Sequence, residues 1–117
     1  DIVIDHMGRM PAGTPLDHAG FQLMLRWLRE GRCWVKLSAP MRFGDPRPPY
    51  PSVVPMAQAL IAAGPGRVVW GTDWPHVRFD GFMPNDADLL DVLALWAPDA
   101  AQRRRILVDN PAALYGF

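Results

Sequence analysis

The sequence predicts an α/β protein made of repeated strand–helix units around a parallel sheet. Three short apolar runs begin near residues 2, 33 and 68, and a segment with helical spacing follows each of them. The starts are 31 and 35 residues apart, which is the size of a βα unit. Polar, titratable residues follow the runs where the strands end. Because ligands bind at the carboxyl ends of parallel strands, the sequence also predicts a site at one edge of the sheet.

Length and charge bound the class of protein. The chain has 117 residues, of which 50% are hydrophobic, and this composition suits one globular domain or part of one. Its 12 basic and 12 acidic residues balance. A balanced charge argues against nucleic acid or a membrane surface as a partner.

The cysteine count and the first residues carry two further expectations. Cys33 is the only cysteine, which excludes an intramolecular disulfide and favours a cytoplasmic location. No apolar run approaches the roughly 20 residues that span a bilayer. Residues 1–4 already read as a strand and include no initiator methionine, so we expect the chain to be cut from a longer one.

The first predicted unit has a strand at residues 2–4 and a helix at 17–30. Asp17 is predicted to cap the start of this helix and Gly31 to end it. The second unit has a strand at 33–38 and a helix at 53–63. The long, proline-rich loop between them is typical of a binding segment.

The third predicted strand covers residues 68–71, and helices fill the rest of the chain. Asn85 or Asp86 is predicted to cap a helix that closes at Pro98, and another helix is predicted at 99–108. A terminal turn of helix is predicted to dock on its neighbours through Leu114, Tyr115 and Phe117. Three tryptophans are most simply core residues: Trp34, Trp70 and Trp96.

Asp73 and His6 are the main candidates for chemistry. Asp73 follows the third strand in a Gly-Thr-Asp turn, so it is either a general base or metal ligand at a pocket, or a carboxylate that caps the local turn. His6 follows the first strand and is either a pocket residue or a core histidine with a satisfied ring.

Further candidates lie in the same predicted loops. Arg9 and Arg42 are either solvent-facing loop residues or a pair that holds an anionic substrate. His76 is a second titratable group in the loop that carries Asp73. Ser38 has no neighbouring base in sequence and no Gly-x-Ser-x-Gly motif, which argues against a nucleophilic serine. Lys36 points into a barrel interior or outward beneath the helices, and the sequence leaves both open.

Four motifs carry a resemblance to a known family. They are Asp-His-Met-Gly-Arg at 5–9, Val-Lys-Leu-Ser-Ala at 35–39, Trp-Gly-Thr-Asp-Trp-Pro-His at 70–76, and Asp-Asn-Pro-Ala-Ala-Leu-Tyr-Gly-Phe at 109–117. With these motifs the chain resembles the amidohydrolase superfamily, in the "amidohydrolase 2" branch of the pyrone-dicarboxylate hydrolases. The resemblance implies a (β/α)8 TIM barrel, of which residues 1–117 would be a partial domain holding strands 6 to 8 with their helices.

The resemblance also implies roles for the candidate residues. Asp73 would be the general base that takes a proton from the attacking water, and His6 would polarise or position the substrate carbonyl. The substrate would be a small carboxylated lactone or a similar ester. Arg9 and Arg42 would hold the carboxylates of this substrate, and His76 would line the pocket that binds it.

The chain departs from the family pattern in its length. A complete barrel takes roughly 250 residues, and the family's His-x-His pair on strand 1 has no counterpart here. We therefore expect no cofactor in this chain, with zinc in the complete barrel as the alternative. We also expect the chain to be inactive by itself. Its expected partner is the missing N-terminal half or a second copy of the chain. The competing functions are a metal-dependent decarboxylase of the same superfamily and a non-catalytic truncated remnant.

Overall fold

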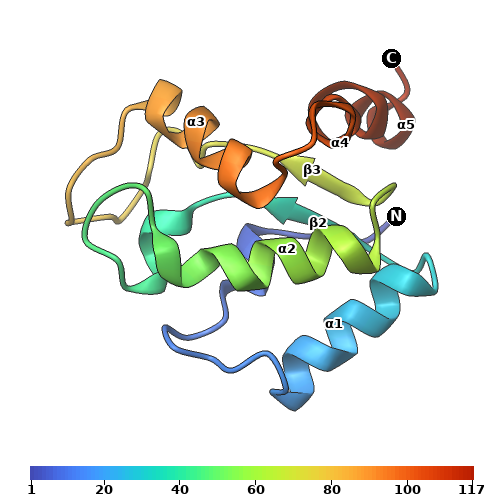
Figure 1. Cartoon of the computed structure of the whole chain (residues 1–117), viewed down its shortest axis with the longest axis horizontal. Coiled ribbons are helices and arrows are strands. Elements are labelled where there is room, and N and C mark those ends of the chain that lie inside the picture. The colour runs from blue at the N-terminus through green and yellow to red at the C-terminus, as the bar shows by residue number, and fades with distance from the viewer.

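Three parallel strands form the centre of the fold, which a computed structural model describes over residues 1–117 (Figure 1). They are β1 (Val3–Ile4), β2 (Trp34–Leu37) and β3 (Val68–Trp70), in the order β1-β2-β3. Val35 at the centre of the sheet lies beside Ile4 on one side and Val68 on the other. The prediction of three parallel strands, each followed by helical structure, is confirmed.

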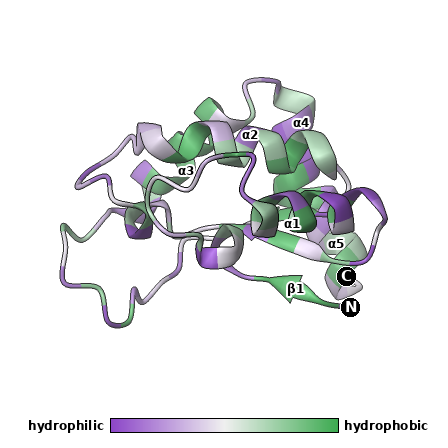
Figure 2. Ribbon diagram, turned by 90° about the horizontal axis from the view of Figure 1, so that it is seen from below, coloured by the Kyte–Doolittle hydropathy of each residue, from purple (hydrophilic) through white to green (hydrophobic).

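Helices α1 and α2 cover one face of the sheet, and the last helices lie beside β3 (Figure 1). Both chain termini lie at one end of the molecule, and the strands point away from that end (Figures 1 and 2). The α-helices are α1 (Ala19–Arg29), α2 (Val54–Ala63), α3 (Asp86–Trp96), α4 (Ala100–Arg104) and α5 (Asn110–Tyr115). Shorter turns are the 3-10 helices η1 (His6–Arg9), η2 (Pro40–Phe43) and η3 (Pro51–Val53), and the π-helical turn η4 (Arg105–Asp109).

The hydrophobic core lies between the sheet and the helices. Side chains alternate along β2, and Val35 and Leu37 have no exposed surface on the helix-covered face. Phe21 of α1 and Leu60 of α2 are also fully buried in this cluster. Coloured by hydropathy, the helices carry both hydrophilic and hydrophobic residues, whereas β1 is hydrophobic (Figure 2). Burying a side chain of this size contributes about 1.5–3 kcal/mol, so this layer stabilises the fold.

Helix α1 begins later than its predicted start. Asp17 was the predicted cap, but the helix starts at Ala19 and His18 occupies the cap position. The His18 ring accepts a hydrogen bond from the Gly20 N–H at 3.2 Å, an N–H that the helix itself leaves without a partner. The prediction was wrong because an imidazole nitrogen can replace the usual carboxylate or hydroxyl.

The C-terminal region is one nearly continuous helical run rather than a helix and a separate terminal turn. The π-helical turn η4 joins α4 to α5, and Asn110 is buried where α5 begins. The Asn110 amide donates to the carbonyls of Pro65 and Val68, at 2.9 and 2.7 Å, and so attaches α5 to the start of β3. The predicted docking of the last aromatic residues is wrong: Tyr115 and Phe117 are exposed and stack on each other.

The tryptophans differ from one another in burial. Trp96 belongs to the core as predicted. Trp34 is buried outside that cluster, with the Arg67 guanidinium 5.2 Å from its ring centre, and Trp70 is only half-buried. The alternation along β2 puts Trp34 on the face away from the helices, which explains its different surroundings.

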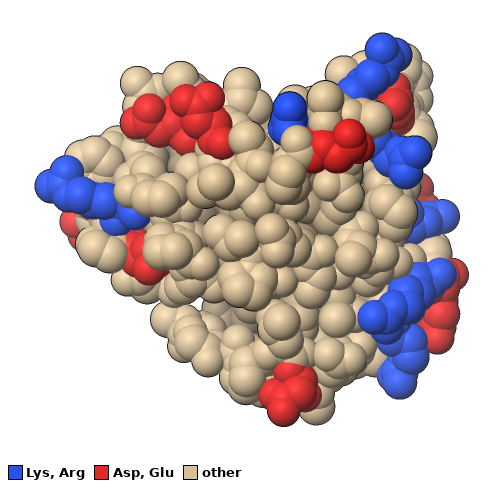
Figure 3. All heavy atoms as spheres, in the orientation of Figure 1, with Lys and Arg blue, Asp and Glu red and all other residues tan.

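Charged side chains lie around the periphery of the helix-covered face (Figure 3). Its centre is uncharged, and helix α2 contains no charged residue. Both signs of charge are present on this face (Figure 3). None of the helices combines the length and the apolar character needed to cross a membrane.

Candidate active site

Asp73 stands at the carboxyl edge of the sheet, shortly after β3. The chain turns there through Gly71 and Thr72, and the Asp73 backbone has φ 84°, in the left-handed region. The Thr72 hydroxyl accepts the Trp74 N–H at 3.0 Å, and the Asp73 carbonyl accepts the His76 N–H at 2.7 Å. Left-handed backbone is unfavourable for residues with side chains, and such residues gather at functional sites. The turn therefore holds the Asp73 side chain in one direction at some conformational cost.

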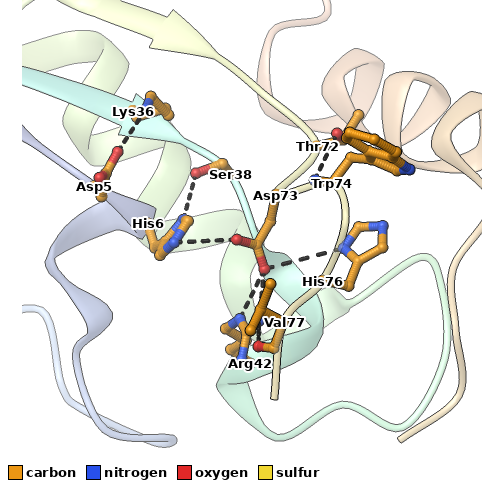
Figure 4. Close-up of polar contacts among 10 residues, drawn as sticks. All are labelled: Asp5, His6, Lys36, Ser38, Arg42, Thr72, Asp73, Trp74, His76 and Val77. Carbon is orange, nitrogen blue, oxygen red and sulfur yellow. Dashed lines mark hydrogen bonds and ion pairs between the residues drawn. The ribbon is translucent and has the colours of Figure 1, made fainter. Parts of the chain in front are cut away.

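The Asp73 carboxylate contacts side chains that follow the other two strands (Figure 4). Its Oδ1 lies 3.2 Å from Nε2 of His6, which comes shortly after β1. Its Oδ2 accepts a hydrogen bond from Nε of Arg42, beyond β2, at 2.8 Å, and lies 2.8 Å from Nη2 of the same guanidinium. The three loops thus bring an imidazole, a guanidinium and a carboxylate together, because parallel strands end at the same edge.

His6 has a second partner that the sequence did not indicate. Its Nδ1 lies 2.8 Å from the hydroxyl of Ser38, the residue that directly follows β2 (Figure 4). Ser38 has no exposed surface. No base lies next to Ser38 in the sequence, but the His6 imidazole, 32 residues away in the loop after β1, lies beside its hydroxyl. The rule that adjacent parallel strands end together was the signal that could have found this pair.

Arg42 is held on several sides. Besides Asp73, its Nη2 donates to the Val77 carbonyl at 2.9 Å, and its guanidinium lies 5.6 Å from the centre of the Phe79 ring. Only 11% of its side chain is exposed. Arg42 therefore joins the loop after β2 to the loop after β3 and neutralises the Asp73 carboxylate.

His76 is buried between two carboxylates. Its Nδ1 lies 4.0 Å from Asp73 and its Nε2 lies 3.4 Å from Asp86, the first residue of α3. Neither ring nitrogen makes a hydrogen bond within the chain. Asp86 was considered from the sequence only as a helix cap, whereas the cap is Asn85, whose side chain accepts the Ala87 N–H.

Arg9 and Lys36 lie outside this group of contacts. Arg9 is exposed and makes no ion pair or side-chain hydrogen bond, so it does not touch Asp73, His6 or Arg42. Lys36 is on the face away from the helices, which the sequence could not decide, and its ammonium pairs with Asp5 at 2.6 Å. Of the predicted site residues, His6, Arg42, Asp73 and His76 lie together and Arg9 stands apart.

The sequence of this chain matches a known protein family over its whole length. The sequence profile of a family described as amidohydrolase matches residues 1–117. The chain belongs to the amidohydrolase family. The resemblance drawn from the four motifs is confirmed, and the chain is a member of an enzyme family.

Individual amidohydrolases are similar over nearly the whole chain. The 4-sulfomuconolactone hydrolase of Hydrogenophaga intermedia is 44% identical over 97% of this chain and 38% of its own length. The 2-pyrone-4,6-dicarboxylate hydrolase of Comamonas testosteroni is 39% identical over 97% of this chain and 40% of its own length. A crystal structure of an Agrobacterium tumefaciens protein is 34% identical, with a TM-score of 0.84 over 98% of this chain and 41% of that one.

The amidohydrolase chain described here therefore spans about two fifths of the length of these relatives. The structural neighbours are TIM-barrel amidohydrolases. The predicted fold class, part of a (β/α)8 barrel, is confirmed. The three parallel strands of this chain, each followed by helical structure, are consistent with part of such a barrel.

The side chains of this amidohydrolase segment do not form a metal site by themselves. His6 and Asp73 are two possible ligands, and no group of three or more His, Cys, Asp or Glu side chains is placed to hold a metal ion. Catalytic zinc normally takes three protein ligands. The Arg42 guanidinium on Oδ2 of Asp73 also competes with a cation there. The chemistry available to these residues is that of a carboxylate base beside hydrogen-bond donors.

The site lies on an open edge rather than in a closed pocket. The two hollows on the surface are elsewhere: one of about 340 Å³ lies between residues 48–49 and α3, and one of about 400 Å³ lies along α1. Neither is lined by Asp73, His6 or Arg42. Ligand sites normally bury most of a small molecule, and this edge by itself does not enclose one.

Proposed function

We propose that this chain is part of a hydrolase that opens a carboxylated lactone with water activated by Asp73. The observation that carries the proposal is the contact of the Asp73 carboxylate with His6 and Arg42 at the carboxyl edge of the sheet. A carboxylate at this position is suited to general base catalysis, and the neighbouring donors are suited to oxygen atoms of a substrate. The two lactone hydrolases among the relatives support the same class of reaction.

Asp73 is the base in the first step of this reaction. It takes a proton from a water molecule while the water oxygen bonds to the lactone carbonyl carbon and the C=O electron pair moves onto the carbonyl oxygen. The resulting tetrahedral intermediate collapses, the ring C–O bond breaks, and the ring oxygen takes up the proton that Asp73 accepted, which restores the carboxylate. The product is a ring-opened acid. A positioned base typically contributes about 10²- to 10⁴-fold to such a rate.

His6 is the donor to the carbonyl oxygen. Its Nε2 points at Asp73 with a separation of 3.2 Å, so a carbonyl next to the base is also next to this nitrogen. A hydrogen-bond donor aimed at an oxygen that gains negative charge stabilises the transition state more than the ground state. His6 therefore lowers the barrier to water attack.

The arginines and His76 account for the preference for an anionic substrate. Arg9 is exposed and has no partner, so its guanidinium is free to bind a carboxylate. Arg42 has its Nε and Nη2 directed to Asp73 and Val77, which leaves Nη1 for a substrate. His76 lies on the side of the site toward α3, with its Nε2 3.4 Å from Asp86. The names of the two relatives, a sulfonated lactone hydrolase and a pyrone-dicarboxylate hydrolase, support an anionic lactone as substrate.

The active form includes the remaining strands of the barrel. Ile2 beside β1 is 60% exposed, and β1 is an edge strand with one neighbour, so this side of the sheet is free to pair with further strands. A partner that supplies those strands would also enclose the site. We expect the reaction in the cytoplasm, because the single cysteine is unpaired and buried.

The test is a chimera in which this chain replaces the matching segment of the Hydrogenophaga enzyme. The chimera is expected to open 4-sulfomuconolactone or 2-pyrone-4,6-dicarboxylate, followed by the change in absorbance as the ring opens. Asp73→Asn is expected to lower kcat by about 10²- to 10⁴-fold, because the amide cannot accept the proton. Asp80→Asn is the matched control, since Asp80 lies in the same loop, is exposed and has no partner.

Three outcomes would overturn the proposal. A folded chimera that opens neither lactone removes the hydrolase assignment. An Asp73→Asn chimera that retains full activity removes the base. Release of CO2 from an aromatic acid without ring opening would instead support the decarboxylase.

A further inference from the structure

We propose that Ser38 is a positioning residue of the reaction, whose hydroxyl donates a hydrogen bond to Nδ1 of His6 and keeps Nε2–H directed at the reacting edge. The inference rests on the proposed function, because it concerns how His6 is presented to a substrate. It starts from a single contact, the 2.8 Å separation between the Ser38 hydroxyl and Nδ1.

The state of the His6 ring follows from what faces each nitrogen. Nε2 faces a carboxylate oxygen of Asp73 at 3.2 Å, and a carboxylate accepts hydrogen bonds but cannot donate them. A neutral imidazole carries one N–H, so the proton belongs on Nε2, and Nδ1 is left as an acceptor. A serine hydroxyl can donate or accept, and here it must donate.

The direction of every hydrogen bond in the group is then fixed. Arg42 donates to Oδ2 of Asp73, Nε2 of His6 faces Oδ1 of Asp73 at 3.2 Å, and Ser38 donates to Nδ1 of His6 (Figure 4). Chains in which each group has its partner hold side chains in one orientation. When a substrate carbonyl takes the place of Asp73 as the partner of Nε2, the Ser38 hydrogen bond is the contact that keeps the ring in position.

Burial separates this role from that of a nucleophile. Ser38, His6 and Asp73 occur in the order of a catalytic triad, and such triads are recognised by geometry rather than by sequence order. However, Ser38 has no exposed surface, and a nucleophile must reach the carbonyl carbon. A buried hydroxyl can hold the histidine but cannot attack the substrate.

The first experiment measures which ring nitrogen of His6 carries the proton, in the 117-residue chain. Two-bond ¹H–¹⁵N correlation spectra distinguish protonated from unprotonated ring nitrogens, and the chain has only three histidines. At a pH where the rings are neutral, His6 is expected to be protonated on Nε2. His18 is an internal reference, since its Nδ1 accepts from a backbone N–H and must also be unprotonated. A proton on Nδ1 of His6 would overturn the proposal.

The second experiment measures kinetics in the chimera. Ser38→Ala leaves Nδ1 without its donor, and kcat is expected to fall about 10- to 100-fold with KM nearly unchanged. In the isolated chain the same variant shifts the Nδ1 signal of His6. Ser38→Thr keeps the hydroxyl and is expected to recover most of both effects if circular dichroism shows that it folds. Ser52→Ala is the control, because Ser52 is exposed in the 3-10 helix η3 and its hydroxyl donates to Asp45.

The outcomes separate this inference from the proposed function. A chimera that is inactive before any substitution fails the proposed function, whereas the Nε2–H state of His6 is still tested by the spectra. Unchanged kcat in Ser38→Ala overturns the positioning role. Loss of all activity with Ser38→Thr as inactive as Ser38→Ala, together with an acylated Ser38 in mass spectra, would show a nucleophile instead.

Discussion

The carboxyl edge of the sheet and the helix-covered face differ in backbone as well as in chemistry. Eight residues other than glycine have a positive φ, and all of them lie in segments that follow a strand: His6, Met7, Arg9, Ala39, Tyr50, Asp73, His76 and Arg78. In the two turns that lead from a helix back into a strand, the only positive φ belongs to Gly31. Unfavourable backbone persists only where the surroundings hold it. The comparison indicates that the buried core holds the unfavourable backbone of the loops that carry the candidate site.

The helix-covered face has the opposite character. The side chains that pack between the sheet and the helices are apolar and fully buried, among them Val35, Leu37 and Leu60. Substitutions there are expected to change stability, whereas substitutions at the edge are expected to change substrate binding or rate. Three substitutions test this division, and the one with the largest expected effect comes first.

Leu60→Ala tests the core. Leu60 has no exposed surface, so the smaller side chain leaves a cavity among α2 and its neighbours. The free energy of unfolding is expected to fall by about 2–5 kcal/mol, measured by urea denaturation followed by circular dichroism. Leu90→Ala is the matched control, since Leu90 is 44% exposed on α3 and should cost far less. Equal losses for the two variants would show that the apolar layer is not the source of stability.

Arg9→Gln tests the edge. Arg9 is exposed and makes no ion pair or side-chain hydrogen bond, so its loss should leave the unfolding midpoint nearly unchanged. If its guanidinium binds the substrate's anion, KM for an anionic lactone in the chimera should rise about 10- to 100-fold, the value of a charged hydrogen bond. Arg105→Gln, also exposed but distant in η4, is the comparison variant. An unchanged KM would leave Arg9 as a surface residue.

Much of the fold could be predicted from sequence because its periodicity is local. The three strands are short apolar runs, and α2 starts within one residue of its predicted position. The wrong start of α1 came from a local cap by His18, whereas the wrong C-terminal boundary came from a contact distant in sequence. The join between α4 and α5 is an example, since it depends on the Asn110 amide reaching the carbonyls of Pro65 and Val68.

The candidate site shows the same division. Asp73, His6 and Arg42 could be proposed because each follows a strand, and parallel strands end together. Ser38 was judged by its neighbours in sequence, and its actual partner lies on another strand's loop. Asp86 was missed for a similar reason, since its contact with His76 requires α3 to pack over the loop. The carboxyl edge of the sheet can be predicted from the sequence, whereas the side chains that pair with one another there can be identified only from the structure.

Tyr50 offers the smallest and most discriminating test, because it lies between the two regions. Its backbone is left-handed like that of the edge residues, but its side chain is fully buried and its hydroxyl has no hydrogen-bond partner. Burial raises the pKa of Tyr50, and the Asp88 carboxylate raises it further. An unpartnered buried hydroxyl contributes little to stability, so Tyr50→Phe should change the unfolding free energy at neutral pH by no more than about 1 kcal/mol.

The sign of the alkaline effect follows from proton binding. An unfolded tyrosine ionises near pH 10, while folded Tyr50 keeps its proton to higher pH, so above about pH 10 the unfolded state binds fewer protons and stability falls as pH rises. Burial also raises the pKa of the Cys33 thiol, which adds a loss of the same sign beginning near pH 9. Tyr50→Phe is therefore expected to reduce the alkaline loss without abolishing it, in urea titrations from neutral pH to pH 11. Tyr115→Phe is the control, because that ring is 57% exposed. Equal curves for Tyr50→Phe and the parent chain would contradict the burial of this hydroxyl and assign Tyr50 to the exposed edge.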